Sequence, residues 1–177
     1  MVACAIDDNV QNHQLMLLHG AQGKGKSTFI RHLLPPELKD YYRNGMIIPE
    51  NNNHLLQLSS CLLINLDEFD TLSPERMQNL KSLITQDVVN ERKVYDIQNY
   101  TYIRRASFIA STNNPHCMPD VKENRRILFS TLLNIDYHTP VNHEGIYAQA
   151  YALYRQGFQY WYENCLLYTS PSPRDRQ

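Results

Sequence analysis

The chain has 177 residues, of which 42% are hydrophobic and 20% are charged. These proportions fit one globular domain with its own hydrophobic core, and they exclude a disordered chain and a small disulfide-stabilised scaffold. The formal net charge of -1 at pH 7 excludes a uniformly basic surface, so a nucleic-acid contact must come from a local patch.

Cysteine and histidine spacing indicates no metal site. The seven histidines make no ligand-spaced cluster with the cysteines, and no CxxC pair occurs, which favours a reduced protein. No segment has the layout of a signal peptide, and no apolar run approaches the roughly 18 residues that a membrane span needs. A soluble protein of the cytoplasm is therefore expected. The cysteines are Cys4, Cys61, Cys117 and Cys165.

The two ends of the chain differ from its middle. Residues 1–13 indicate the end of a helix and a turn, and Met1 is expected to be an internal methionine of a longer protein. Residues 165–177, CLLYTSPSPRDRQ, change abruptly from a helical pattern to Ser, Pro and Arg. They resemble the conceptual translation of a sequencing-library adapter, with a natural disordered tail as the alternative. We expect a non-native tail there and one domain over residues 14–164.

The first half of that domain predicts strands and helices in alternation. LMLLHG, residues 15–20, is a short apolar run that indicates a buried strand, and residues 27–34 have helical spacing up to two prolines. CLLINL, residues 61–66, indicates a second buried strand that ends in acids. A helix is predicted next over residues 73–86, with Ser73 as its N-cap.

The second half predicts a hairpin, two strands and a helix. Residues 94–103, VYDIQNYTYI, alternate partly around a polar centre, which suggests the hairpin. Residues 106–114 and 125–133 indicate a third and a fourth apolar strand. Residues 145–162 carry apolar side chains near helical spacing, which predicts an amphipathic helix.

A glycine-rich loop follows the first strand. GAQGKGKS, residues 20–27, satisfies GxxxxGK[ST] between a predicted strand and a predicted helix, the context of a phosphate-binding loop. Such glycines turn backbone N–H groups toward phosphates, Lys26 supplies a cation to them, and Ser27 offers a hydroxyl to Mg²⁺. A dinucleotide turn is excluded because Thr28 stands where that fingerprint needs glycine; a flexible basic turn remains the alternative. We assign nucleotide binding to Gly20, Gly23, Gly25, Lys26, Ser27 and Thr28.

Two adjacent acids, Asp67 and Glu68, follow the second buried strand. Open α/β sheets bind ligands at the carboxyl ends of their strands, so Asp67 is placed to hold Mg²⁺ and Glu68 to polarise a water for attack on the γ-phosphate. This pair favours hydrolysis over transfer to a small acceptor. Asp70 is expected to be a helix-start or surface residue.

Polar residues beyond the third strand complete the candidate site. Asn113 directly follows Ser-Thr at the strand end and is the expected sensor of the γ-phosphate, whereas Asn114 fits turn chemistry. Arg125 and Arg126 precede the fourth strand, and guanidinium groups there are candidates to reach the nucleotide of a neighbouring subunit. Surface charge or internal salt bridges are the alternative for both arginines.

These motifs together resemble the P-loop ATPase domain of the virulence-associated protein E family, which is related to superfamily three helicases and AAA+ ATPases. GAQGKGKST, LLINLDEFD, IRRASFIASTNN and ENRRILF carry the resemblance, which spans most of residues 2–162. It implies an α/β P-loop NTPase fold whose mostly parallel central sheet is flanked by helices, ATP and Mg²⁺ as ligands, and a homo-oligomeric ring. It also implies a primase-helicase type of protein from a phage or mobile element, with a primase-like region upstream.

The resemblance implies a DNA-contacting hairpin as well. In related helicases the segment before the sensor strand projects into a central pore, and here ERKVYDIQNYTYIRR, residues 91–105, has two more cationic than acidic side chains, with interleaved tyrosines. Cations with aromatics suit single-stranded DNA, and Lys93, Arg104 and Arg105 are the candidate contacts. A solvated hairpin whose tyrosines pack on the sheet is the equal alternative.

Two functions remain open from the sequence. The first is an ATP-driven DNA motor, helicase-like, in a bacterial or phage-infected cell. The second is an ATP-gated interaction or DNA-loading module that does not unwind. Stimulation of hydrolysis by single-stranded DNA would distinguish the motor from the module.

Overall fold

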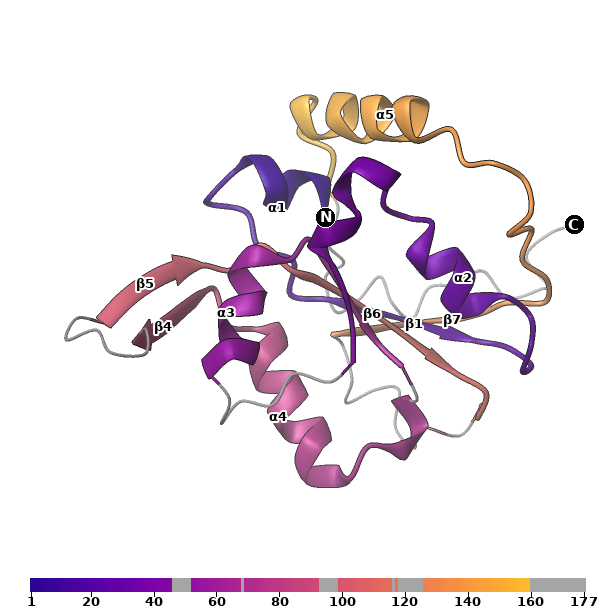
Figure 1. Cartoon of the computed structure of the whole chain (residues 1–177), viewed down its shortest axis with the longest axis horizontal. Coiled ribbons are helices and arrows are strands. Elements are labelled where there is room, and N and C mark those ends of the chain that lie inside the picture. Colours follow the sequence, from indigo (N-terminus) through magenta and orange to yellow (C-terminus); the bar gives the residue numbers. More distant parts are fainter. Residues whose placement is uncertain (46–51, 68, 93–98, 116, 118–125, 160–177) are drawn as a thin grey trace, which may run out of the picture.

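The computed structural model describes residues 1–45, 52–67, 69–92, 99–115, 117 and 126–159. Within them, five parallel strands form one sheet in the order β2-β3-β6-β1-β7, and two antiparallel strands form a separate hairpin. Helices lie on both sides of the sheet (Figure 1). The predicted α/β fold with a mostly parallel central sheet is therefore confirmed. The strands of the sheet are β1 (Leu15–His19), β2 (Tyr42–Asn44), β3 (Leu63–Leu66), β6 (Ser107–Thr112) and β7 (Ile127–Thr131).

The central strands are buried along their length because both faces of the sheet are covered. Every residue of β3 and of β6 is buried, as expected for strands that have neighbours on both edges and helices on both faces. One face packs a cluster that includes Leu17 of β1 and Phe108 of β6. The other face packs a smaller cluster around Leu18 and Ile109.

Different helices cover the two faces. Helices α3 (Asn52–Ser60) and α4 (Pro74–Ile84) supply Leu58 and Leu80 to the larger cluster. Helix α2 (Lys26–Arg31) supplies Ile30 to the smaller one. Figure 1 shows α1 (Val2–Ile6) and α5 (His143–Arg155) on the same side as α2, and α3 and α4 on the opposite side. Short 3-10 helices follow α2 (Pro36–Tyr41) and β3 (Phe69–Thr71).

Local signals at the helix ends account for two predicted helices. Ser73 Oγ accepts a hydrogen bond from Arg76 N at 3.3 Å, so α4 begins with the predicted N-cap. Helix α5 begins earlier than predicted, because Asn142 Oδ1 accepts from Gly145 N at 3.0 Å. It also ends earlier, at Arg155, shortly before Gly157 with its φ of 72°.

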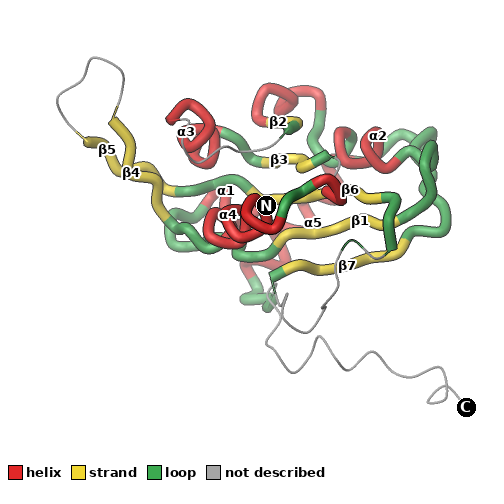
Figure 2. Tube along the Cα trace, turned by 90° about the horizontal axis from the view of Figure 1, so that it is seen from below, coloured by secondary structure: helices red, strands yellow, loops and turns green. Residues whose placement is uncertain are grey.

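The hairpin is present, and its first strand lies earlier than the sequence indicated. Strand β4 (Val88–Arg92) pairs with β5 (Asn99–Ile103), with Val88 opposite Ile103 and Arg92 opposite Asn99. Figure 2 shows this pair extending away from the sheet. No expectation from the sequence covered β2 or α3, whose short or mixed polar segments carry no clear periodicity.

Candidate functional site

The phosphate-binding motif forms the turn between β1 and α2, at the carboxyl end of β1. Gly23 and Gly25 have φ values of 75° and 79°, which only glycine adopts without strain. Gly20 is constrained by packing instead, since a Cβ there would lie 3.0 Å from the carbonyl oxygen of Leu132. Gly23 and Gly25 are therefore glycines because of their backbone conformation. Gly20 is a glycine because the backbone of Leu132 approaches it closely.

Lys26 is the centre of the site. Its side chain is only 8% exposed, and its Nζ donates hydrogen bonds to Gly20 O at 2.6 Å, Ala21 O at 2.9 Å and Asn113 Oδ1 at 2.7 Å. Burial lowers the pKa of Lys26 from its ordinary value, and the negative charges of Asp67 and Asp70 oppose that shift. The lysine is thus held at one position by three oxygens, two from the start of the loop and one from the residue that follows β6.

The carboxylate of Asp67 is oriented by the neighbouring strand. Ser111 Oγ, near the end of β6, donates to Asp67 Oδ1 at 3.1 Å. One residue further, Thr112 Oγ1 donates to Asp70 Oδ1 at 3.2 Å. Asp70 is exposed, as expected from the sequence, and it still contributes to the electrostatics of Lys26.

A cavity of about 350 Å³ brings these groups together. Its lining combines the phosphate loop with residues from three later segments of the chain. Of the residues that the sequence assigned to nucleotide, cation and sensor roles, Gly20 is absent from the lining, and the lining includes Gly23, Gly25, Lys26, Ser27, Thr28, Asp67 and Asn113. Glu68 lies outside the described residues. The lining is formed by residues 22–28, Asp67, Ser111, Asn113 and Tyr137.

Sequence reasoning missed two of these lining residues. Ser111 is part of the Ser-Thr pair at the end of β6, where the sequence assigned a role only to Asn113, and Tyr137 stands in a connection after β7 that matches no motif. Parallel pairing of β3 with β6 brings Ser111 to Asp67. A tertiary contact with Gly25 brings Tyr137 to the loop.

The donor set fits a hard divalent cation. Asp67 supplies a carboxylate and Ser27 a hydroxyl in the same cavity, and Mg²⁺ prefers oxygen ligands of this kind together with phosphate oxygens. Among the described residues no group of three His, Cys, Asp or Glu side chains is placed to bind a metal by itself. Such a site fits a cation that enters with its nucleotide.

Arg126 lies at the amino ends of the strands, whereas the glycine-rich loop lies at their carboxyl ends. The carbonyl oxygen of Arg126 accepts from Leu15 N at 2.8 Å, at the start of β1, whereas the loop begins after the last residue of that strand. Five residues of strand at about 3.3 Å each separate Leu15 from Gly20 by roughly 16 Å. Arg126 is therefore remote from the nucleotide site of its own chain. Arg125 lies outside the described residues.

Two of the three candidate DNA contacts are used inside the protein. Arg104 is 1% exposed, and its guanidinium donates to three carbonyl oxygens, those of Gln86, Ala106 and Asn12, at 2.6 to 2.7 Å. The expectation of a DNA contact is wrong for Arg104, because its guanidinium is buried and donates its hydrogen bonds to carbonyl oxygens of the protein. Arg105 is partly exposed and donates to Asp8 Oδ1 and to the carbonyls of α1. Lys93 lies outside the described residues.

Replacing Arg104 with alanine is expected to lower the free energy of unfolding by at least about 3 kcal/mol. Three buried carbonyl oxygens would lose their donor, and each unsatisfied buried polar group costs about 1–3 kcal/mol. Arg105→Ala is the matched control, with an expected loss of about 1 kcal/mol because its ion pair with Asp8 is exposed to solvent. Urea denaturation measures both, and equal losses would contradict a structural role special to Arg104.

The hairpin tyrosines divide between the two alternatives. Tyr102 packs against the larger core cluster, as the packing alternative expected. Tyr100 lies near it, with ring centroids 6.3 Å apart, and is only partly buried. A stacking role for the hairpin stays a prediction.

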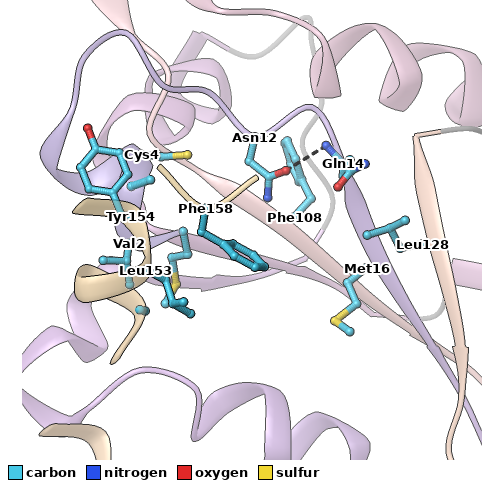
Figure 3. A pocket seen from close by; sticks show the side chains of 13 residues that line it. Val2, Cys4, Asn12, Gln14, Met16, Phe108, Leu128, Leu153, Tyr154 and Phe158 are labelled. Carbon is cyan, nitrogen blue, oxygen red and sulfur yellow. Dashed lines mark hydrogen bonds between the residues drawn. The ribbon is translucent and has the colours of Figure 1, made fainter. Parts of the chain in front are cut away.

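A second cavity, of about 430 Å³, lies between α1, α5 and the sheet. Figure 3 shows Val2, Leu153 and Phe158 facing Met16 and Leu128 across it. Its described lining has no acidic or basic side chain, so it lacks the groups that bind phosphate or metal. This cavity is distinct in chemistry from the one at the phosphate loop.

No helix in the part of the chain that the structure describes is long and apolar enough to cross a membrane.

Cys4, Cys61 and Cys117 are free thiols. Burial raises the pKa of the Cys61 and Cys117 thiols, which disfavours the reactive thiolate.

Solved structures with the same fold are found at low sequence identity. The A form apo structure of the NrS-1 C terminal region (305–718) is similar with a TM-score of 0.51 and 17% identity, over 79% of this chain and 34% of that chain. Another A form apo structure of the NrS-1 C terminal region gives 0.50 and 17%, over 89% and 39%. The chain thus spans little more than a third of these structures, and the likeness concerns the fold.

A comparison with curated proteins found no match. A family comparison did: the Virulence-associated protein E-like domain matches residues 1–168. That range includes the four motifs on which the sequence resemblance depended. The chain belongs to the virulence-associated protein E-like domain family.

Proposed function

We propose that this chain is a P-loop ATPase domain that drives a helicase-like motor on DNA, as part of a primase-helicase type of replication protein. One observation carries the proposal. Lys26, Asp67 and Asn113 come from three separate segments and line one cavity at the carboxyl ends of parallel strands. That is where open α/β sheets bind nucleotides.

In the proposed site the phosphate loop binds the triphosphate. Lys26 Nζ exchanges at least one of its three oxygen acceptors for an oxygen of the β- or γ-phosphate, and the positive charge stabilises the phosphate ground state. Release of Asn113 from Lys26 frees its carboxamide to orient the attacking water. Glu68 is proposed to accept a proton from that water.

The cation is proposed to be held by Ser27 and Asp67. When bound, Mg²⁺ supplies charge neutralisation for the phosphate oxygens. The chain's own contribution is orientation, because Ser111 fixes Asp67 Oδ1 at 3.1 Å and limits the rotamers of that carboxylate.

The proposed assembly is a homo-oligomeric ring around single-stranded DNA, with the β4–β5 hairpin directed at the strand and Lys93 as its DNA contact. Arg126 lies at the amino end of β1, away from the phosphate loop of its own chain. This location supports a role for Arg126 at the nucleotide of a neighbouring subunit. An ATP-gated loading module is the competing function. If single-stranded DNA leaves the hydrolysis rate of the wild-type chain unchanged, the motor is excluded and the module is favoured.

Lys26→Ala is expected to weaken ATP binding at least 10-fold, since a buried cation with three oxygen partners is removed from the phosphate site. Lys39→Ala is the matched control, because Lys39 is exposed on the 3-10 helix after α2, outside the cavity lining, and is expected to change affinity less than threefold. Calorimetric titration with ATP and Mg²⁺ measures both. Similar affinities for the two variants would remove Lys26 from the nucleotide site and the ATPase proposal with it.

A further inference from the structure

The aromatic ring of Tyr137 packs directly on the phosphate loop. A Cβ at Gly25 would lie 2.1 Å from Tyr137 Cδ1, 2.4 Å from Cε1 and 2.8 Å from Cγ, distances that no real side chain tolerates. Gly25 is the glycine immediately before Lys26, so the ring lies beside the position that binds phosphate. The close approach gives Gly25 a second reason to be glycine, independent of its φ of 79°.

The segment that carries Tyr137 is held against the loop at both ends. Leu132 N donates to His19 O at 2.8 Å, directly before the phosphate loop. Tyr147 Oη donates to Leu33 O at 2.9 Å beyond the end of α2. Figure 1 shows the connection between β7 and α5 passing on the α2 side of the sheet. Tyr137 is thus part of an anchored strap, defined here as residues 132–142.

The turn that bears Tyr137 is itself ordered by hydrogen bonds. Asp136 Oδ1 accepts from His138 N and Thr139 N, both at 3.1 Å, and Asp136 Oδ2 accepts from Thr139 Oγ1 at 2.6 Å. These bonds lower the pKa of Asp136, so the turn is stable at neutral pH. The imidazole of His138 lies with its centroid 4.2 Å from that of Tyr137.

The cavity therefore has two chemically different walls. Lys26, Asp67 and Asn113 supply charge and polar groups, which suit phosphates and a cation. Tyr137 is the only aromatic residue in the described lining. A phenol ring adds little to the binding of phosphate, whereas its face stacks on a nucleobase and its hydroxyl hydrogen-bonds a ribose.

We propose that Tyr137 binds the nucleoside part of the nucleotide, its base and ribose, while the phosphate loop binds the phosphates. This inference rests on the proposed nucleotide site and adds a residue from the strap to it. It predicts that Tyr137 distinguishes a nucleoside triphosphate from a bare polyphosphate. The competing role of the same ring is to obstruct the loop. Obstruction predicts that removal of the ring tightens the binding of nucleotide and polyphosphate alike.

The test compares two probes, ATP and inorganic tripolyphosphate, each titrated with Mg²⁺ into the wild-type chain and two variants. Tyr137→Ala is expected to weaken ATP binding roughly 5- to 100-fold, the loss of one stacking contact, and to leave tripolyphosphate affinity within about twofold. Tyr137→Phe is expected to keep ATP affinity within about threefold, because the ring remains. Tyr151→Ala, at an exposed tyrosine of α5, is the control and is expected to change neither affinity.

Each other outcome overturns the inference. Equal losses for ATP and tripolyphosphate in Tyr137→Ala would assign the ring to the integrity of the loop. Tighter binding of both probes would assign it to obstruction. If the wild type binds ATP tightly and Tyr137→Ala binds it equally well, Tyr137 has no role in ATP binding, and the proposed nucleotide site stands without it. A wild-type chain that binds neither probe would overturn the nucleotide site itself. Tyr137→Leu keeps an apolar side chain on Gly25 and removes the aromatic face, so a loss of ATP affinity without a loss of tripolyphosphate affinity in this variant tests the inference if the alanine variant is unstable.

Discussion

Replacing Arg125 and Arg126 together with alanine is expected to lower ATP turnover by about 10³-fold, the contribution of an arginine finger in P-loop enzymes. We expect these arginines to act on the nucleotide that a neighbouring subunit binds. Arg126 pairs with Leu15 at the start of β1, so the body of the sheet separates it from the phosphate loop of its own chain. Arg125 lies outside the described residues and is adjacent to Arg126 in sequence.

Mixing distinguishes a finger from a structural arginine. The inactive double variant is expected to regain activity when it is mixed with inactive Lys26→Ala chains, because each Lys26→Ala subunit still carries both arginines and completes the intact site of its neighbour. Activity per chain is also expected to rise with protein concentration or with single-stranded DNA. Arg76→Ala, at an exposed position on α4, is the control with near-wild-type turnover. Flat specific activity and no recovery on mixing would refute the assignment.

Glu68→Gln is expected to reduce turnover by about 10²- to 10⁴-fold while ATP affinity stays within a few fold, as for loss of a general base. Glu68 lies outside the described residues, and the expectation rests on its place next to Asp67. Asp67 itself lines the cavity with Lys26. The adjacent carboxylate is therefore expected to act on water, whereas Lys26 acts on the ground-state phosphates.

Binding and hydrolysis must be measured separately to check this division. Glu75→Gln is the control, because Glu75 makes the same acid-to-amide change on the exposed first turn of α4. Single-turnover hydrolysis gives the chemical step and calorimetry gives the affinity. Loss of ATP binding in Glu68→Gln as large as in Lys26→Ala would contradict a role confined to the water.

Much of the candidate site follows from the sequence because its signals are local. GxxxxGKS requires a particular backbone path over eight residues, and apolar runs before it and at residues 61–66 predict buried strands. Parallel strands place their carboxyl ends at one edge. The meeting of Lys26, Asp67 and Asn113 at one cavity could therefore be expected from their positions after the strands alone.

The tertiary structure decided what the side chains outside those motifs do. The sequence predicted Arg104 to be a surface cation of a hairpin, yet its guanidinium donates to three carbonyl oxygens, two of them from the distant residues Asn12 and Gln86, and no local pattern encodes those contacts. Tyr137 stands in a segment without periodicity, and only the path of the strap from β7 to α5 sets it on Gly25. Sequence spacing determines which backbone turns and faces form. The contacts between segments distant along the chain depend on how the whole sheet and its connections pack.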